Sequence, residues 1–363
     1  MPRLRRPDAL KAPFPLPPLA EQRRIVAKVD ELMGLCDRLE EARAERDTRR
    51  DRVVAASLGR VAQQSDRDDS TSKREIVDFC LANLDQTTQR QRDVEAIRQT
   101  VLSLAVSGRL VPQDPLDEPG GQLLRRIKSA KVALANEGVI RKEKLRVGTS
   151  EDSVPFEIPP TWTWARIGDC ALRTEYGTSV KSENTRDGVP VLKMGDIQSG
   201  RVSLRRHSRV PLDIEDLPDL FLKRFDLLYN RTNSAELVGK TGIFDGEDDT
   251  FTFASYLIRI QFVSDLTNPA YVNLAMNAPY FRPTQILPEL TQQCGQANVN
   301  GTKLRGMLIP LPPLAEQNRI AGRVSELMDL CDQLDVAIVD AQEWRTSLLS
   351  ADIEAALGAD RPA

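Results

Sequence analysis

Three polar segments of this 363-residue chain carry side chains that could bind nucleic acid. Tyr176–Lys181 combines an aromatic ring, a glycine, two hydroxyls and a lysine, and Asn230–Ser234 is a dense polar run after an apolar stretch. Gln292–Lys303 holds three Gln, two Asn and one Lys without an acidic residue. Paired donors and acceptors on such side chains read base edges, whereas hydroxyls, amines and backbone N–H groups bind phosphates. An isolated run of this kind is more often a solvated turn, so composition leaves both interpretations open.

The candidate nucleic-acid contacts come from these three segments and from the lysine shortly after the second. They are Tyr176, Gly177, Thr178, Ser179, Lys181, Asn230, Arg231, Thr232, Asn233, Ser234, Lys240, Gln293, Gln296, Asn298, Asn300 and Lys303. The overall charge does not decide the matter, because 50 basic residues face 53 acidic ones and the net charge is -3. Contacts with nucleic acid would therefore depend on local groups or on a partner.

Enzymatic chemistry has little support in the sequence. The run Val238–Thr241 (VGKT) lacks the upstream glycine of a phosphate-binding loop, since Ser234 stands at that position. No dinucleotide fingerprint is present, and the single histidine, His207, excludes a His-rich metal site. We therefore expect no catalytic residue, no cofactor and no metal. A self-contained methyltransferase or nuclease is the enzymatic alternative, and it would need a cofactor loop that the sequence lacks.

The strongest pattern is an internal repeat. Pro15–Glu40 and Pro310–Asp335 match at 18 of 26 positions with an offset of 295 residues. Copies this far apart are not a solenoid, whose units abut. They are matching elements at the two ends of an intervening domain.

Each copy predicts a helix that packs on another helix. The prolines give an extended approach, and a helix is expected to start near Leu19 and near Leu314. Apolar residues then alternate at spacings of four and three, which indicates a helix–helix seam. The predicted interface residues are Ile25, Val29, Leu32, Cys36 and Leu39 in the first copy and Ile320, Val324, Leu327, Cys331 and Leu334 in the second. The partner could be the other copy or another chain, and ordinary bundle core is the plainer alternative.

Patterning predicts a mixed α/β fold, with one globular α/β domain flanked by long α-helical coiled-coil arms. The expected segments are a non-matching stretch 1–14, a first arm 15–64, a helical region and linker 73–146, the globular domain 154–309 and a second arm 310–358. Helices are expected over Ala20–Ala62, Arg74–Val106, Gly121–Asn136 and Asn268–Asn277. Strands are expected over Trp164–Ile167, Val189–Met194, Asp226–Asn230 and Phe253–Phe262.

The sequence also predicts the role of two tryptophans and the cellular compartment. Trp162 and Trp164 are expected to anchor the core rather than to stack on bases. No apolar run approaches the ~20 residues of a membrane span. The five cysteines are widely spaced, which fits a reducing cytoplasm.

Five stretches, in order, carry a family resemblance. They are PLPPLAEQ in both repeat copies, VSGRLVPQDPLDEP, PFEIPPTWTWARIGD, YNRTNSAELVGKTGIF and ANVNGTKLRGMLIPLPP. On these stretches the chain resembles the DNA specificity subunit of Type I restriction-modification systems. The resemblance implies that 154–309 is a target recognition domain for one half of a bipartite site in double-stranded DNA. It also implies that the arms act as spacer and dock for the methyltransferase subunits, through which the restriction subunit joins, and that the chain itself is not catalytic.

The chain departs from the family pattern in one respect. Members of the family usually carry two recognition domains, and this chain carries one; Met1–Phe14 does not match Gln296–Ile309. It therefore resembles either a half-subunit that dimerises or a subunit without its first half. In the first case two chains would pair through their arms on a two-fold axis and read inverted half-sites. A coiled-coil scaffold and an inactive remnant of a two-domain subunit are the remaining alternatives.

Overall fold

The computed structural model describes residues 15–63, 90–140, 154–205, 207–263, 265–293 and 296–359. The predicted stretch 1–14 and the helical run over 74–89 lie outside the described residues. The chain divides into two compact units, residues 1–87 and 88–363. No helix among the described residues is both long enough and apolar enough to cross a membrane.

Among its described residues, the first unit has one long helix, α2 (Leu19–Gln63), close to the predicted range. The prolines before it cannot continue a helix, so the chain enters in an extended form. The backbone N–H of Glu21 donates to the Pro18 carbonyl at 2.8 Å, and the Gln22 side chain donates to the Pro17 carbonyl at 2.8 Å. With 45 residues, α2 is about 68 Å long at ~1.5 Å per residue.

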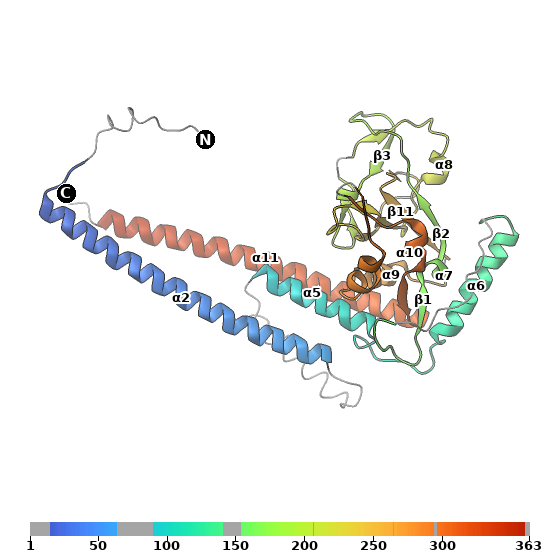
Figure 1. The fold of residues 1–363 in the computed structure, drawn as a ribbon, viewed down its shortest axis with the longest axis horizontal. Helices are drawn as coiled ribbons and strands as arrows, with labels where there is room; N and C mark the ends of the chain where they lie inside the picture. Colours follow the sequence, from blue (N-terminus) through green and yellow to red (C-terminus); the bar gives the residue numbers. More distant parts are fainter. Residues whose placement is uncertain are drawn as a thin grey trace. The chain divides into compact units, whose positions relative to one another are not determined.

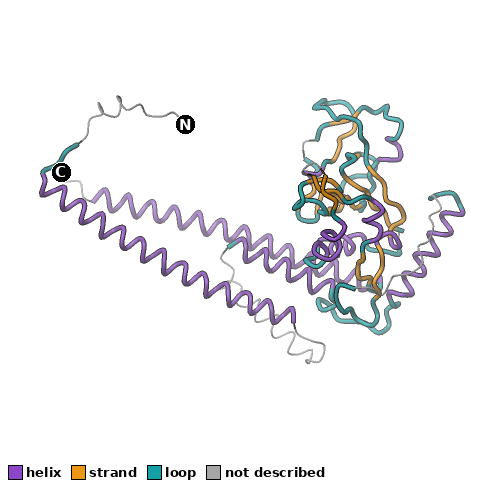
Figure 2. The backbone as a smooth tube through the Cα atoms, viewed as in Figure 1, coloured by secondary structure: helices purple, strands orange, loops and turns teal. Residues whose placement is uncertain are grey.

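The second unit holds all described strands and the remaining helices (Figure 1). Its helices are α5 (Gln91–Val106), α6 (Gly120–Asn136), α7 (Ile167–Cys170), α8 (Leu217–Leu220), α9 (Pro269–Asn277), α10 (Gly301–Gly306) and α11 (Leu314–Ala359). Its strands are β1 (Thr163–Arg166), β2 (Ala171–Tyr176), β3 (Val189–Leu192), β4 (Ile197–Gln198), β5 (Arg201–Val202), β6 (Arg209–Val210), β7 (Leu227–Asn230), β8 (Thr232–Asn233), β9 (Thr241–Ile243), β10 (Thr252–Phe253), β11 (Leu257–Phe262), β12 (Thr291–Gln293), β13 (Gln296–Asn298) and β14 (Leu308–Leu311). The mixed α/β fold is therefore confirmed, and Figure 2 shows how the strands gather at one end of the long helix α11.

A six-stranded sheet of order β2-β11-β7-β9-β5-β4 is the centre of the domain. Both of its faces are covered, so β7 is buried at all four positions. Leu227 and Tyr229 point to the larger core beside α9, whereas Leu228 points to a second core around Phe244 and Phe253. This alternation follows from the two-residue period of a strand.

The first and last strands of the domain pair with each other. β1 and β14 are antiparallel, with Thr163 opposite Leu311 and Trp164 opposite Pro310. The strand β14 has only one partner, so the missing N–H of Pro310 breaks no hydrogen-bonded ladder. Gly120 lies so close to this strand pair, the β1–β14 clasp, that a Cβ atom would come 2.2 Å from the Leu311 carbonyl oxygen. Glycine is therefore required where α6 begins.

The start of α11 is anchored by polar groups inside the domain. Glu316 is 1% exposed and accepts from the Trp162 indole at 2.9 Å and from the Gln113 amide. Gln317 is fully buried and accepts from the backbone N–H of Asn268 at 2.9 Å. Burial raises the pKa of Glu316, and the two donated hydrogen bonds oppose that shift. The expectation that Trp162 belongs to the core is confirmed.

The helix α5 packs along the domain-proximal half of α11 (Figure 1). Val94 joins Cys331 and Ile338 in a small buried cluster. Beside it, the Arg98 guanidinium lies 2.6 Å from Asp332 and 2.9 Å from Asp335. The second repeat copy therefore packs on a helix of its own unit.

This packing corrects the predicted interface role of the second seam. Ile320, Val324 and Cys331 are at most 3% exposed, and Leu327 and Leu334 are half-buried beside them. α5 and the domain cover the five residues, so they form core within the chain rather than a surface between subunits. In the first copy the equivalent residues Ile25, Val29, Leu32 and Leu39 are 48–61% exposed, and Cys36 is exposed as well. Their predicted interface role stays a prediction.

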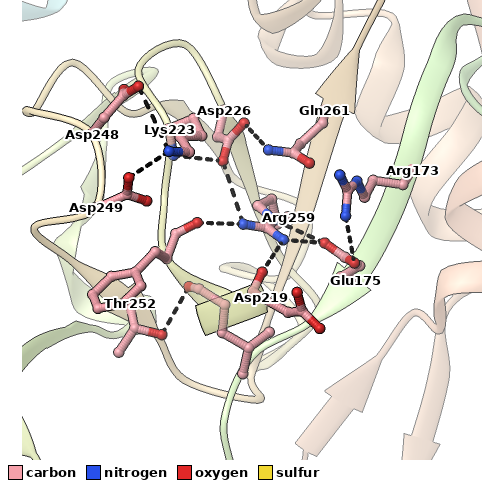
Figure 3. Close-up of polar contacts among 12 residues, drawn as sticks. Arg173, Glu175, Asp219, Lys223, Asp226, Asp248, Asp249, Thr252, Arg259 and Gln261 are labelled. Atoms are coloured by element: carbon pink, nitrogen blue, oxygen red, sulfur yellow. Dashed lines mark hydrogen bonds and ion pairs between the residues drawn. The ribbon is translucent and has the colours of Figure 1, made fainter. Parts of the chain in front are cut away.

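A buried arginine organises the second core (Figure 3). Arg259 on β11 is 2% exposed and donates to the carbonyls of Phe221 at 2.6 Å and Asp219 at 2.7 Å. Its guanidinium also binds the Glu175 carboxylate and lies 3.7 Å from Asp226. These contacts tie α8 to the sheet, because the planar guanidinium offers five donors in fixed directions.

We expect the pH dependence of stability to change in Asp226→Asn. Burial raises the pKa of Asp226 from 3.8 to about 6, although hydrogen bonds and Arg259 oppose the shift. Because the folded pKa lies above the unfolded one, this carboxyl stabilises the fold most below pH 4, and that contribution is lost as the pH rises through 6. Between pH 4 and 7, the free energy of unfolding should therefore fall by up to about 3 kcal/mol more in the parent than in the variant. Urea unfolding from pH 4 to 7 measures this, and parallel profiles would contradict it.

We expect Arg259→Met to cost about 3–5 kcal/mol of unfolding free energy, because it leaves two buried or half-buried carboxylates without their cation. Arg173→Met is the matched control, since Arg173 also pairs with Glu175, at 3.5 Å, but its side chain is 39% exposed. The control should change stability by at most ~1 kcal/mol. Equal losses in the two variants, measured by urea denaturation, would show that burial of the ion pair is not the cause.

Candidate nucleic-acid interface

The fold brings the three polar segments of the sequence together. Tyr176 ends β2, and its hydroxyl accepts from the backbone N–H of Gly301 at 2.7 Å, at the start of α10. The strands β8 and β13 pair antiparallel, with Asn298 opposite Thr232. Segments more than a hundred residues apart in sequence therefore share one surface of the domain.

Arg231 lies at the centre of this surface. Its guanidinium carbon is 4.8 Å from the centroid of the Tyr176 ring, within the range of a cation–π contact. Its side chain donates to the Ser255 carbonyl at 3.2 Å and lies 3.5 Å from the Asn298 amide oxygen. Its backbone donates to the Tyr256 carbonyl at 3.0 Å and accepts from Val299 at 2.9 Å. The guanidinium is therefore held in place from several sides.

The charge of Arg231 is not neutralised inside the domain. Its partners are carbonyls, an amide and an aromatic ring, and no carboxylate of the described chain forms an ion pair with it. Its Nε atom is buried without a hydrogen-bond partner among the described residues. A fixed cation with donors left over, beside an aromatic ring that is 45% exposed, suits a phosphate or the acceptor edge of a base.

The remaining predicted residues fall into three groups by exposure. Ser179, Lys181, Ser234, Lys240, Gln296 and Asn300 are exposed, like Tyr176. Gly177, Arg231, Asn233, Asn298 and Lys303 are half-buried. Thr178, Asn230 and Thr232 are at most 9% exposed. Gln293 belongs to β12, and its side chain lies outside what the structure describes.

The three buried residues are corrected from contact candidates to supporting residues. Asn230 is the last residue of β7, and the strand alternation turns its side chain into the domain, where it is fully buried. Thr178 instead bridges to Ala254 through its backbone, and Thr232 holds the pairing of β8 with β13. These residues can position the loops, but a DNA surface would not reach their side chains.

Three of the polar residues make hydrogen bonds that stabilise the chain itself. Asn300 caps α10, because its side chain accepts from the backbone N–H of Lys303 at 2.9 Å. The Lys303 amine donates to the Glu289 carbonyl at 2.8 Å and to the Thr291 hydroxyl at 3.0 Å. The Asn233 side chain likewise accepts from Ser234 at 2.8 Å. The turn interpretation therefore holds for part of Asn230–Ser234 and part of Gln292–Lys303.

Tyr256 was missed by the sequence analysis. It is 47% exposed, and its carbonyl binds the backbone of Arg231. The two-residue alternation of Ile258 and Ile260 places position 256 on the core side of an unbroken strand. The strand begins only at Leu257, however, and the preceding turn directs Tyr256 outward. An exposed aromatic residue before a strand is the signal that could have been used.

Metal-dependent chemistry gains no candidate from the geometry. Within the described parts of the chain, no three His, Cys, Asp or Glu residues come together as metal ligands. His207 is buried, with its Nδ1 atom 3.4 Å from Asp196 and its ring packed edge-on against Phe251.

Comparison with known proteins finds chains of similar sequence. Residues 159–338 match the profile of the Type I restriction modification DNA specificity domain. The chain is 29% identical over 349 residues to the Type I restriction enzyme EcoEI specificity subunit of Escherichia coli. The aligned region covers 95% of this chain and 58% of that protein. Identity to the EcoAI specificity subunit of Escherichia coli is also 29%, over 357 residues and the same shares of the two chains. The chain thus spans less than two thirds of the length of these relatives.

One solved structure that aligns with this chain is the HsdS subunit from Thermoanaerobacter tengcongensis, with a TM-score of 0.41 and 18% identity over 96% of this chain and 62% of that one. The expected resemblance is therefore confirmed at the level of the domain profile and of the related specificity subunits. Residues 159–338 therefore resemble the Type I restriction modification DNA specificity domain, and the chain as a whole resembles the specificity subunits of Type I restriction enzymes.

Proposed function

We propose that this chain is a sequence-specific DNA-binding subunit, in which the surface around Arg231 reads one half of a bipartite target. The observation that carries the proposal is the fixed, unneutralised guanidinium of Arg231 between Tyr176 and Asn298. Bidentate donors of this kind recognise guanine in the major groove, and an amide beside them can read a neighbouring base. The exposed Lys181 and Lys240 would then bind phosphates and set the register.

The helical arms are proposed to assemble the complex. Beyond the reach of α5, the distal half of α11 exposes Trp344, Leu348 and Ile353, which are 58–72% exposed. Several large apolar side chains exposed along one helix indicate a surface that another protein covers. We propose that methyltransferase subunits dock along the arms and that the restriction subunit joins through them. In this arrangement catalysis belongs to the partners, and this chain chooses the DNA site.

A coiled-coil scaffold without DNA binding is the second candidate. The exposed apolar residues of both arms favour it, and the balanced net charge does not oppose it. The two candidates differ in what the domain does with duplex DNA, so DNA binding separates them.

Selection from random-sequence duplexes tests the proposal directly. The full chain should enrich one short motif, and its affinity for that motif should fall steeply as salt rises, because bound phosphates release counterions. Sequencing of the bound pool and titrations at several salt concentrations are the measurements. A pool without an enriched motif would favour the scaffold.

Arg231→Ala should weaken binding to the selected motif by about 10- to 100-fold, the range expected for one bidentate base contact. Arg231→Lys keeps the charge but loses the planar fork, so it should also lose discrimination against mismatched motifs. Arg126→Ala on α6 is the matched control, since its side chain is 57% exposed and pairs with Glu118. It removes the same charge elsewhere and should change affinity by less than about twofold. Equal losses in Arg231→Ala and Arg126→Ala would contradict the assignment.

A further inference from the structure

The two repeat copies have nearly the same sequence but different surroundings. In the second copy, α5 and the loop after it cover one face of α11. In the first copy the same face of α2 is open, with Ile25, Val29 and Leu32 each about half exposed. Local structure is shared, because Gln22 and Gln317 donate to equivalent proline carbonyls at 2.8 and 3.0 Å. The difference therefore lies in what covers each face.

Polar contacts hold α5 and the loop after it against the second repeat copy at several positions along α11. Near its start, Gln113 donates to Glu316, and the Arg319 guanidinium lies 2.7 Å from Asp117. Farther along, Arg98 donates to Asp332 at 2.6 Å and Asp335 at 2.9 Å. Near the start of α5, Val94 adds an apolar contact with Cys331 and Ile338.

The first copy retains the groups within the repeat that receive this cover. Glu21, Arg24, Met33, Cys36 and Asp37 are identical to Glu316, Arg319, Met328, Cys331 and Asp332. Glu40 replaces Asp335 and keeps a carboxylate there. Of the eight positions that differ between the copies, six are exposed in the second copy: Asn318, Gly322, Arg323, Ser325, Asp329 and Gln333. The differences thus avoid the covered face.

We propose that this face of α2 is a docking site for a separate recognition unit that presents an α5-like helix followed by a Gln-and-Asp loop. An arginine of the incoming helix would bridge Asp37 and Glu40, as Arg98 bridges the equivalent pair. The Gln and Asp of its loop would bind Glu21 and Arg24. The inference extends the proposed function, since it says where a second recognition unit would attach.

The polar groups favour this occupant over a plain coiled-coil helix. A helix from a second α2 would need only the apolar seam, and it would leave Glu21 and Arg24 without a role in the interface. Just beyond the repeat, Arg43 takes the place of the buried Ile338. The docked helix should therefore end its apolar contact near Cys36 and Leu39.

A labelled peptide with the sequence of residues 88–119 is the probe. It carries Arg98, Gln113 and Asp117, and the equivalent site on α11 of the full chain is already occupied by the chain's own α5. Fluorescence anisotropy with the full chain should show saturable binding to one site. Leu32→Glu should weaken it by at least about tenfold, because it places a charge in the apolar seam.

Leu35→Glu is the matched control. Leu35 is 45% exposed, and its equivalent, Leu330, stays 48% exposed beside the covered face of α11. Binding should stay within about twofold of the parent, since this charge remains in water. Circular dichroism of both variants checks that α2 stays helical.

A charge swap makes the test specific. The peptide variant Arg98→Glu should lose binding to the parent chain and regain it with the chain variant Asp37→Arg/Glu40→Arg. Absence of saturable binding, or equal effects of Leu32→Glu and Leu35→Glu, would overturn the proposal. Self-association of the chain that Leu32→Glu abolishes, without peptide binding, would assign the face to a second copy instead. No DNA is present in these titrations, so their failure is distinct from failure of the proposed DNA recognition.

Discussion

The buried carboxylate of Glu316 is the constraint on which the second unit depends. A charge at that depth is tolerable only because the Trp162 indole and the Gln113 amide donate to it. Those two donors come from the entry of the domain and from the loop after α5. One carboxylate therefore fixes the start of α11 relative to the domain entry and to the loop after α5. The direction of the whole helix follows from that position.

The surface around Arg231 depends on a second kind of constraint, which is the meeting of strands distant in sequence. β8 and β13 are each only two or three residues long, yet their pairing sets Asn298 beside Arg231. Tyr176 is tied in through the first turn of α10. Short elements that are cross-braced in this way hold a binding surface firmly while leaving the residues between them free to vary.

The sequence predicted the architecture better than the site. The helices over α2, α6 and α9, and the strands β1, β3 and β7, lie close to their predicted ranges, because proline entries and apolar periodicity are local signals. The convergence of the three polar segments is not local, since it depends on which strands pair. Asn230 and Arg231 are neighbours, but the Asn230 side chain lies in the core and the Arg231 side chain reaches the surface. The difference depends on the exact residue at which β7 ends. The two repeat copies make the same point, because nearly identical residues are core in one place and surface in the other.

The clasp of β1 and β14 has an evolutionary consequence. Because Thr163 lies opposite Leu311, the domain leaves the helical framework and returns to it at nearly the same place. A genetic exchange with crossover points near these two strands would replace the whole domain, including the surface around Arg231, and leave α5, α6 and α11 unchanged. If that surface selects DNA as proposed, a new specificity would arise by recombination of one segment rather than by gradual substitution.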